Sequence, residues 1–244
     1  MSLNVLMGIL STLALFAPVA IIAIMRLYGH RSFIALFFYY LVATTYNLMT
    51  EDIIHLNSGF VQIFGIVANL LDAPLILLFF IYFSPSAAFS RKIFALIGLF
   101  IAYEITIIAI FNFTKTAVTY FVGPGIFIIL CLSLVFFLRQ VRVTIMHRRA
   151  TGKALMISSI LWAYGCFGVI YLIFYILKES NETSFLVFFI VTTFSSLMMS
   201  AGLIIEKNRI IKLWELKTTR KELSVIFGNN KAAHERAASL KKIK

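Results

Sequence analysis

The chain has 244 residues, of which 61% are hydrophobic and only 13% are charged. Soluble domains carry about 45–50% apolar and about 25% charged residues, so both a water-soluble fold and a disordered chain are excluded. The formal net charge of +12 is typical, in a membrane protein, of cytoplasmic loops and lipid headgroups, and no nucleic-acid partner is expected.

The apolar residues form continuous runs of about 20, which favour membrane-spanning helices over the alternating strands of a barrel. We therefore expect an all-α bundle of seven transmembrane helices within residues 1–205. The predicted spans are residues 3–25, 33–49, 61–83, 93–113, 120–138, 154–177 and 184–205. The first run lacks a preceding basic segment, so it is expected to remain as a span rather than act as a signal peptide. Residues 123–125, Gly-Pro-Gly, are expected to cause a kink or a late start in the fifth span.

The distribution of Lys and Arg predicts the orientation of these spans. All but two of the 22 basic residues lie in the first, third and fifth linkers or after residue 205, and the two exceptions are Lys115 and Lys178. The positive-inside rule then places the N-terminus outside and the C-terminus in the cytoplasm. The sequence predicts a multi-pass protein of the plasma (inner) membrane.

Residues 206–244 are predicted to form a basic cytoplasmic tail that begins with an amphipathic helix. This helix either lies in the membrane interface or continues the last span into solvent. Residues 228–230, Gly-Asn-Asn, are expected to end it, with a loosely ordered basic segment following. Anionic lipid headgroups or a cytoplasmic protein are the expected partners of the tail and of residues 139–153. Whether the chain forms a homo-oligomer is left open.

Two acidic residues lie inside the predicted spans, Asp72 in the third and Glu104 in the fourth. A charge at the bilayer centre costs at least about 2.5–3.5 kcal/mol, so intramembrane acids are functional candidates. No span core contains a Lys, Arg or His that could act as a counterion. Three interpretations stay open: hydrogen bonds that hold helices together, proton or cation handling, and ligand contact.

Polar residues at helical spacing accompany these acids. Gln62 and Asn69 are predicted to share a face of the third span with Asp72 and to point into the bundle. Two further polar stripes occur in the second and seventh spans, formed respectively by Tyr40, Thr44, Asn47 and Glu51, and by Thr192, Ser195, Ser196 and Ser200. The three stripes either line a wet cavity that opens outward or pack the helices against one another.

Seven spans, an outside N-terminus and short loops resemble the microbial (type I) rhodopsins. Residues 70–78, Leu-Leu-Asp-Ala-Pro-Leu-Ile-Leu-Leu, are similar to that family's Leu-Leu-Thr-Thr-Pro-Leu-Leu-Leu stretch. Residues 161–165, Leu-Trp-Ala-Tyr-Gly, resemble its Trp-x-x-Tyr-Pro pocket segment with the Trp displaced by one, and residues 202–204 resemble the end of its seventh span. The resemblance implies that Asp72 faces a central pocket to which Tyr164 also belongs.

The chain departs from this family at the residues that carry its chemistry. The family's chromophore is held by a lysine in the seventh span, whereas this sequence has Met198 at the matching position and no lysine between Lys178 and Lys207. Without that amine no Schiff base can form, so neither covalently bound retinal nor another cofactor is expected. The predicted ligand-binding or proton-handling residues are Asp72, Glu104, Asn69, Gln62, Tyr164 and Met198.

Catalysis is not expected, because the four histidines lie in loops or the tail and no span combines a nucleophile with a base. Residues 51–55 contain Glu51, Asp52 and His55, which we interpret as solvated residues rather than a metal site. The expected function is that of a non-enzymatic sensor, ligand-binding or partner-binding membrane protein with its input around Asp72. The alternative is a proton or cation channel or transporter that uses Asp72 and Glu104.

Overall fold

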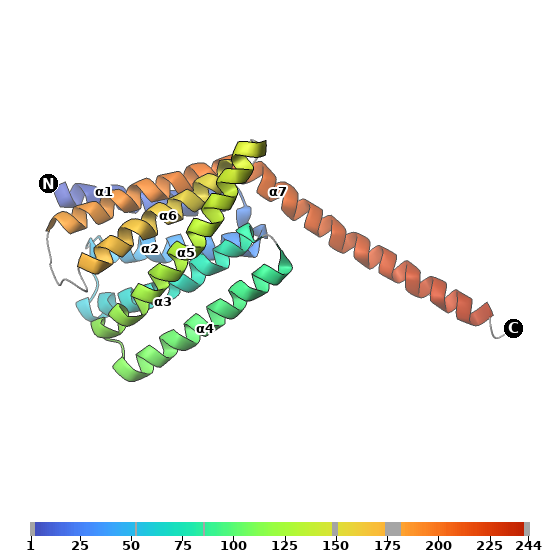
Figure 1. The fold of residues 1–244 in the computed structure, drawn as a ribbon, viewed down its shortest axis with the longest axis horizontal. Helices are drawn as coiled ribbons and strands as arrows, with labels where there is room; N and C mark the ends of the chain where they lie inside the picture. The colour runs from blue at the N-terminus through green and yellow to red at the C-terminus, as the bar shows by residue number, and fades with distance from the viewer. Residues whose placement is uncertain (1–2, 52, 85, 148–150, 174–181, 242–244) are drawn as a thin grey trace. The chain divides into compact units, whose positions relative to one another are not determined.

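The computed structural model describes residues 3–51, 53–84, 86–147, 151–173 and 182–241, and the regular elements in these ranges are all helical (Figure 1). The α-helices are α1 (Leu3–Ile24), α2 (Arg31–Thr50), α3 (Ser58–Phe80), α4 (Ala87–Phe111), α5 (Lys115–His147), α6 (Thr151–Tyr171) and α7 (Glu182–Lys241). The 3-10 turns η1 (Leu27–Gly29) and η2 (Ile81–Phe83) follow α1 and α3. Each of the seven α-helices contains a stretch long and apolar enough to cross a membrane, which confirms the predicted fold class.

Polar residues in the short linkers define where the transmembrane helices begin and end. The Asn57 side chain accepts a hydrogen bond from the backbone N–H of Gly59 at 3.0 Å, and Ser86 Oγ accepts one from Phe89 at 3.2 Å. These caps satisfy backbone donors that have no partner inside the helix. Asn112 ends α4 with a φ of 55° and a ψ of −168°, a backbone conformation that is uncommon outside glycine.

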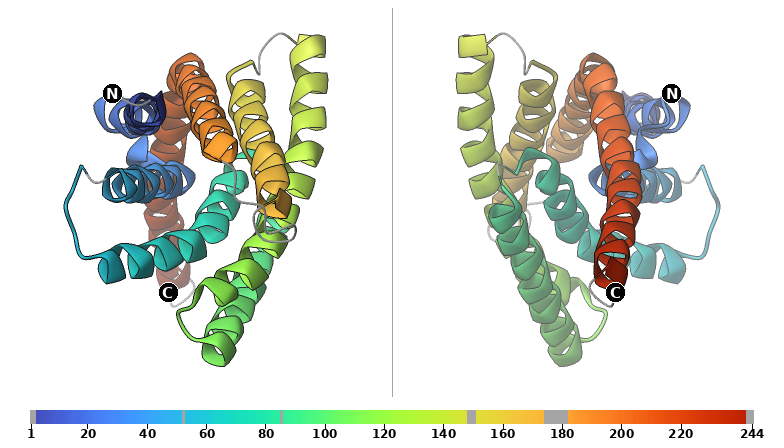
Figure 2. Two further views of the ribbon diagram at one scale, coloured as in Figure 1. Left: turned by 90° about the vertical axis from the view of Figure 1, so that its left-hand side faces the viewer. Right: turned by 90° about the vertical axis from the view of Figure 1, so that its right-hand side faces the viewer.

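The third helix, which carries Asp72, lies in the middle of the bundle. It contacts α2, α4 and α5, while α1 packs on α2, and α5 also contacts α4 and α6. Figure 2 (left) shows this arrangement along the bundle, with the membrane-spanning part of α7 beside α6. The Ser159 hydroxyl of α6 donates a hydrogen bond to the Ser195 carbonyl of α7 at 2.7 Å, so these two helices are in close contact.

The outer surface of the bundle is covered by large apolar side chains. Those exposed by 60% or more include Leu13, Leu99, Ile105, Ile110, Phe127 and Leu138. Such a continuous apolar surface is unfavourable in water and is matched by the hydrocarbon chains of lipids. Contact with a lipid bilayer, as expected from the composition, follows from this surface and from the seven membrane-spanning stretches.

Of two local expectations about helix ends, the one for the fifth span keeps only its kink alternative and the one for the tail is wrong. The fifth helix begins at Lys115, so residues 123–125 lie within it and do not delay its start. Proline is tolerated inside membrane helices because neighbouring groups satisfy the freed carbonyl. The seventh helix continues through residues 228–230 to Lys241. The residues on either side of this Gly-Asn-Asn segment include many strong helix formers, which offset the cost of about 1 kcal/mol for one glycine.

The chain forms two compact units, residues 1–206 and residues 207–244. The first contains the helical bundle up to Glu206 in α7. In the second, α7 continues as a helix to Lys241. All contacts described below lie within the first unit.

Candidate functional site

A hydrogen bond between α3 and α6 forms the centre of the candidate site. The phenol of Tyr164 donates to Asp72 Oδ2 at 2.8 Å, and Tyr164 is only 2% exposed. Tyr39 from α2 lies beside this pair, in electrostatic range of Asp72, and lines the same cavity as Tyr164. Three helices therefore meet at one partly buried carboxyl. The resemblance implied one pocket for Asp72 and Tyr164, but the hydrogen bond between them and the presence of Tyr39 are new.

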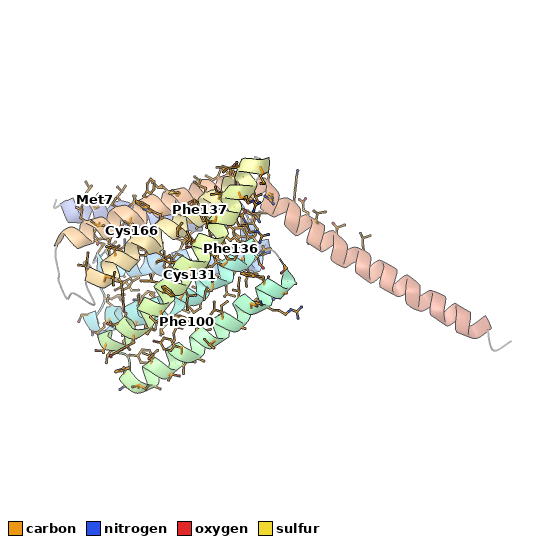
Figure 3. The ribbon with its side chains drawn as sticks, viewed as in Figure 1. Met7, Phe100, Cys131, Phe136, Phe137 and Cys166 are labelled. Carbon is orange, nitrogen blue, oxygen red and sulfur yellow. The ribbon has the colours of Figure 1, made fainter. Side chains whose placement is uncertain are left out.

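The second intramembrane acid, Glu104, also lies inside the bundle. It is 4% exposed, its Oε1 has no hydrogen-bond partner among the described residues, and it lies in electrostatic range of Asp72. Phe100 (labelled in Figure 3) lies one turn earlier on α4 and packs where α3, α4 and α5 meet. Gly125 of α5 is close to it, since a Cβ added there would be 3.2 Å from the Phe100 ring and 3.3 Å from the Ala73 side chain of α3. Leaving a buried polar atom without a partner is costly, so this carboxyl is poised to accept a proton or a ligand.

The other predicted site residues do not join Asp72. The Asn69 side chain donates to the Gly65 carbonyl of its own helix at 2.7 Å. Gln62 is exposed, which corrects the expectation that it points into the bundle. Ten residues separate it from Asp72, and at about 100° per residue the two side chains point about 80° apart. Met198 is partly buried on α7 and does not line the cavity described next.

A small cavity lies between α2, α6 and α7, next to the Asp72–Tyr164 pair. Its volume is about 20 Å³, which is enough for about one water molecule. Organic ligands need cavities of roughly 300–1,000 Å³, so this cavity does not accept one. The polar residues of its lining are Tyr39, Tyr40, Ser159, Tyr164, Thr192, Ser195 and Ser196.

The C-terminal half of the polar stripe on α2 packs against α1 rather than lining a cavity. Asn47 Nδ2 donates to Ser11 Oγ at 2.9 Å and lies 2.7 Å from Thr12 Oγ1. Asn47 is 6% exposed, and the amide is thus satisfied by two hydroxyls of the neighbouring helix. Asn47 therefore packs α2 against α1, as one of the two interpretations of this stripe expected. Tyr40, at the other end of the stripe, lines the cavity.

Glu51 closes the same stripe just beyond the end of α2. Its carboxyl lies directly against Gly8 of α1, where a Cβ would overlap it, and burial there raises the pKa of Glu51 above its usual range. The folded chain therefore binds this proton more tightly than the unfolded chain, so the contribution of Glu51 to stability is most favourable at low pH and declines as the pH rises above about 4.3. We expect Glu51→Gln to remove part of this fall in thermal unfolding curves recorded between acidic and neutral pH in detergent.

The matched control for that measurement is Glu215→Gln, because Glu215 is exposed on α7. The unfolding temperature of the Glu215→Gln variant should change with pH in the same way as that of the unmodified chain. Equal slopes for the Glu51→Gln variant and the unmodified chain would show that burial of Glu51 has no effect on stability.

A second polar cluster, which sequence reasoning missed, surrounds Tyr82 in η2. The Tyr82 hydroxyl donates to Glu206 Oε1 of α7 at 3.2 Å. Lys153 of α6 places its Nζ 4.1 Å from the centre of the Tyr82 ring, a cation–π contact, and the His30 ring lies 5.7 Å away. These residues come from the first, third and fifth linker regions and from α7, so one end of the bundle collects them. We call it the basic end.

The signal for Glu206 was present in the sequence but lay beyond the predicted span. Ser195, Met199, Gly202 and Glu206 recur at spacings of four, three and four residues and are all buried. This spacing is that of one helix face. The buried face of α7 therefore continues past residue 205, and Glu206 belongs to it although a run of basic residues follows.

Comparison of the chain with protein-family models, curated proteins and solved structures found no match. The resemblance to microbial rhodopsins therefore stays an expectation, whereas the seven-helix membrane architecture is shown by the structure. Among the described residues, no group of three or more His, Cys, Asp or Glu side chains is placed to hold a metal ion. Cys131 of α5 and Cys166 of α6 (Figure 3) are free cysteines.

Proposed function

We propose that this chain is a non-enzymatic seven-helix membrane sensor whose input element is the hydrogen bond between Tyr164 and Asp72. The observation that carries the proposal is the 2.8 Å contact itself, which joins α3 to α6 through a carboxyl inside the bundle. The strength of such a bond depends on whether the carboxyl is charged. A proton or a small polar ligand that reaches Asp72 therefore changes how firmly the two helices are held together, and shifts the balance between two arrangements.

The basic end supplies the route for output. Both helices of the input pair lead there: η2 follows α3 and carries Tyr82, and α6 begins two residues before Lys153, which contacts the Tyr82 ring. A displacement of α6 against α3 changes this contact directly. Residues 139–153 and the tail then present the change to the proposed partner, either anionic lipid headgroups or a cytoplasmic protein.

A distance measurement between α4 and α6 at the basic end tests this coupling. Spin labels are placed at Ala87→Cys and Thr151→Cys, both exposed, in a chain whose Cys131 and Cys166 are replaced by serine. Asp72→Asn removes the charge and keeps the side-chain shape, and we expect it to shift the distance distribution between the labels. The control is Gln62→Ala, an exposed position on the same helix, which should leave the distribution unchanged. Identical distributions in all three chains would contradict the proposal.

A proton or cation conductor is the second candidate function. It is favoured by the unpartnered, buried Oε1 of Glu104 and by the electrostatic range between Glu104 and Asp72, since paired acids at this depth are typical of ion pathways. Flux through the purified chain in proteoliposomes separates the two functions. Flux that is abolished by Asp72→Asn and Glu104→Gln would support conduction and overturn the sensor. Absence of flux, together with the label shift above, supports the sensor.

A further inference from the structure

Two hydroxyls of α7 are buried at the cavity between α2, α6 and α7 without a protein partner. Thr192 Oγ1 and Ser196 Oγ make no hydrogen bond within the described chain, and the two residues are 5% and 1% exposed. Both line the cavity. A hydroxyl that leaves water without finding a new partner loses free energy, and native structures contain few of them. A small polar molecule that is part of the folded structure removes this cost.

The remaining lining groups define what such a molecule must offer. Ser159 Oγ donates to the Ser195 carbonyl at 2.7 Å, and Ser195 Oγ donates to the Thr192 carbonyl at 3.1 Å, so both hydroxyl oxygens keep lone pairs that can accept. The Tyr40 hydroxyl lies beside Ser159 and Ser196. A molecule that both donates and accepts hydrogen bonds, and that has two to four polar neighbours, matches this lining.

The size and charge of the cavity identify the molecule. Its volume of about 20 Å³ admits about one water and excludes larger solutes. The described lining residues include no charged side chain, so a metal cation would lose its hydration without gaining an anionic ligand.

We propose that this cavity is a specific binding site for one water molecule, held by Thr192 and Ser196 of α7 and by Tyr40 of α2. Tyr164 also lines the cavity, so the bound water lies between the Asp72–Tyr164 hydrogen bond and α7. The inference does not depend on the sensor function, because it rests on the unpartnered hydroxyls and the cavity alone. It places a polar molecule between helices α2 and α7, next to the Asp72–Tyr164 pair.

Hydroxyl-radical footprinting by X-ray pulses, read by mass spectrometry, tests this site because radicals form from water and label the residues next to it. We expect Tyr40 and Tyr164 to be labelled although they are 5% and 2% exposed, while Phe79 and Phe80, both 0% exposed, are not. Ser196→Val fills the cavity and removes one anchor, so labelling of both tyrosines should fall several-fold. Protection of the two tyrosines equal to that of the two phenylalanines would show a dry cavity and overturn the proposal.

Ser133→Val is the matched control variant. Ser133 of α5 is 0% exposed and thus as buried as Ser196, but its hydroxyl donates to the Leu130 carbonyl and it does not line the cavity. Labelling of Tyr40 and Tyr164 should be the same in this variant as in the unmodified chain. If Ser196→Val leaves the labelling unchanged, the water lies elsewhere and the assigned site is wrong.

Thermal unfolding in detergent gives a second test, because Ser196→Ala should change the unfolding temperature in opposite directions for a cavity with bound water and for a dry cavity. If water is bound, Ser196→Ala removes one of its anchors and lowers the unfolding temperature. If the cavity is dry, the same change removes an unsatisfied buried hydroxyl, and the unfolding temperature stays equal or rises. An increase in unfolding temperature when choline chloride is replaced by sodium chloride, lost in Ser196→Ala, would assign the site to a cation instead and overturn the water proposal.

Discussion

Replacing Tyr164 with phenylalanine is expected to lower the free energy of unfolding by about 1–3 kcal/mol. The substitution keeps the ring, which is almost completely buried, and removes only the hydroxyl that donates to Asp72 Oδ2. The carboxyl then loses a donor in a place where water cannot easily replace it. Chemical or thermal unfolding of the purified chain in detergent micelles measures the difference.

Tyr171→Phe is the matched control, because Tyr171 lies on the same helix. Its hydroxyl donates to the Thr119 carbonyl of α5 at 2.6 Å, so the change removes a hydrogen bond to a neutral acceptor. Bonds of this kind contribute about 0.5–1.5 kcal/mol, less than bonds to charged groups. Equal losses in the free energy of unfolding for the two variants would show that the hydrogen bond to Asp72 stabilises the fold no more than one to a neutral carbonyl.

Gly202→Ala is expected to have the other large effect, with a loss of about 1–3 kcal/mol from overpacking between α6 and α7. A Cβ at this position would lie 2.6 Å from Met156 Cγ, 3.0 Å from the Met156 backbone N and 3.1 Å from the Gly152 carbonyl oxygen. The side chain can move aside, but the two backbone atoms can do so only if the helices separate. Such a separation also lengthens the hydrogen bond between Ser159 and Ser195.

The control for this variant is Gly98→Ala on α4, where a Cβ would meet nothing within 4 Å. Alanine is the better helix former, so this change should leave stability equal or raise it by about 0.5–1 kcal/mol. We thus expect Gly202→Ala to lower the free energy of unfolding and Gly98→Ala to leave it equal or raise it, in the same unfolding assay. A Gly202→Ala variant as stable as Gly98→Ala would mean that α6 and α7 do not pack as closely as the structure shows.

The transmembrane helices could be predicted from the sequence because their signal is local. An apolar run of about 20 residues specifies a span whatever its neighbours are. Partners across helices carry no such signal: Asp72 and Tyr164 are 92 residues apart, and nothing in either segment states which helix face meets the other. Gln62 shows how small angular errors matter, since a ten-residue separation already turns it away from Asp72.

The basic end could not be predicted for a different reason. Glu206 is followed directly by Lys207 and other basic residues, a pattern that favours a solvated segment after a span. Its burial depends on Gly152 of α6, whose missing side chain leaves room for Glu206: a Cβ there would lie 3.0 Å from Glu206 Oε2. Such a match between a small residue and a large one on two helices is a property of packing and is not visible in either helix alone.

A double-mutant cycle between Tyr164→Phe and Asp72→Leu is the most direct measurement of whether α3 and α6 are joined through this acid. Each substitution removes one polar partner, and the double variant leaves neither of them unsatisfied. We predict a coupling energy of about 0.5–3 kcal/mol, so that Tyr164→Phe costs little once Asp72 is absent. Strictly additive effects, with Tyr164→Phe equally costly in both backgrounds, would contradict the contact on which the proposed input element depends.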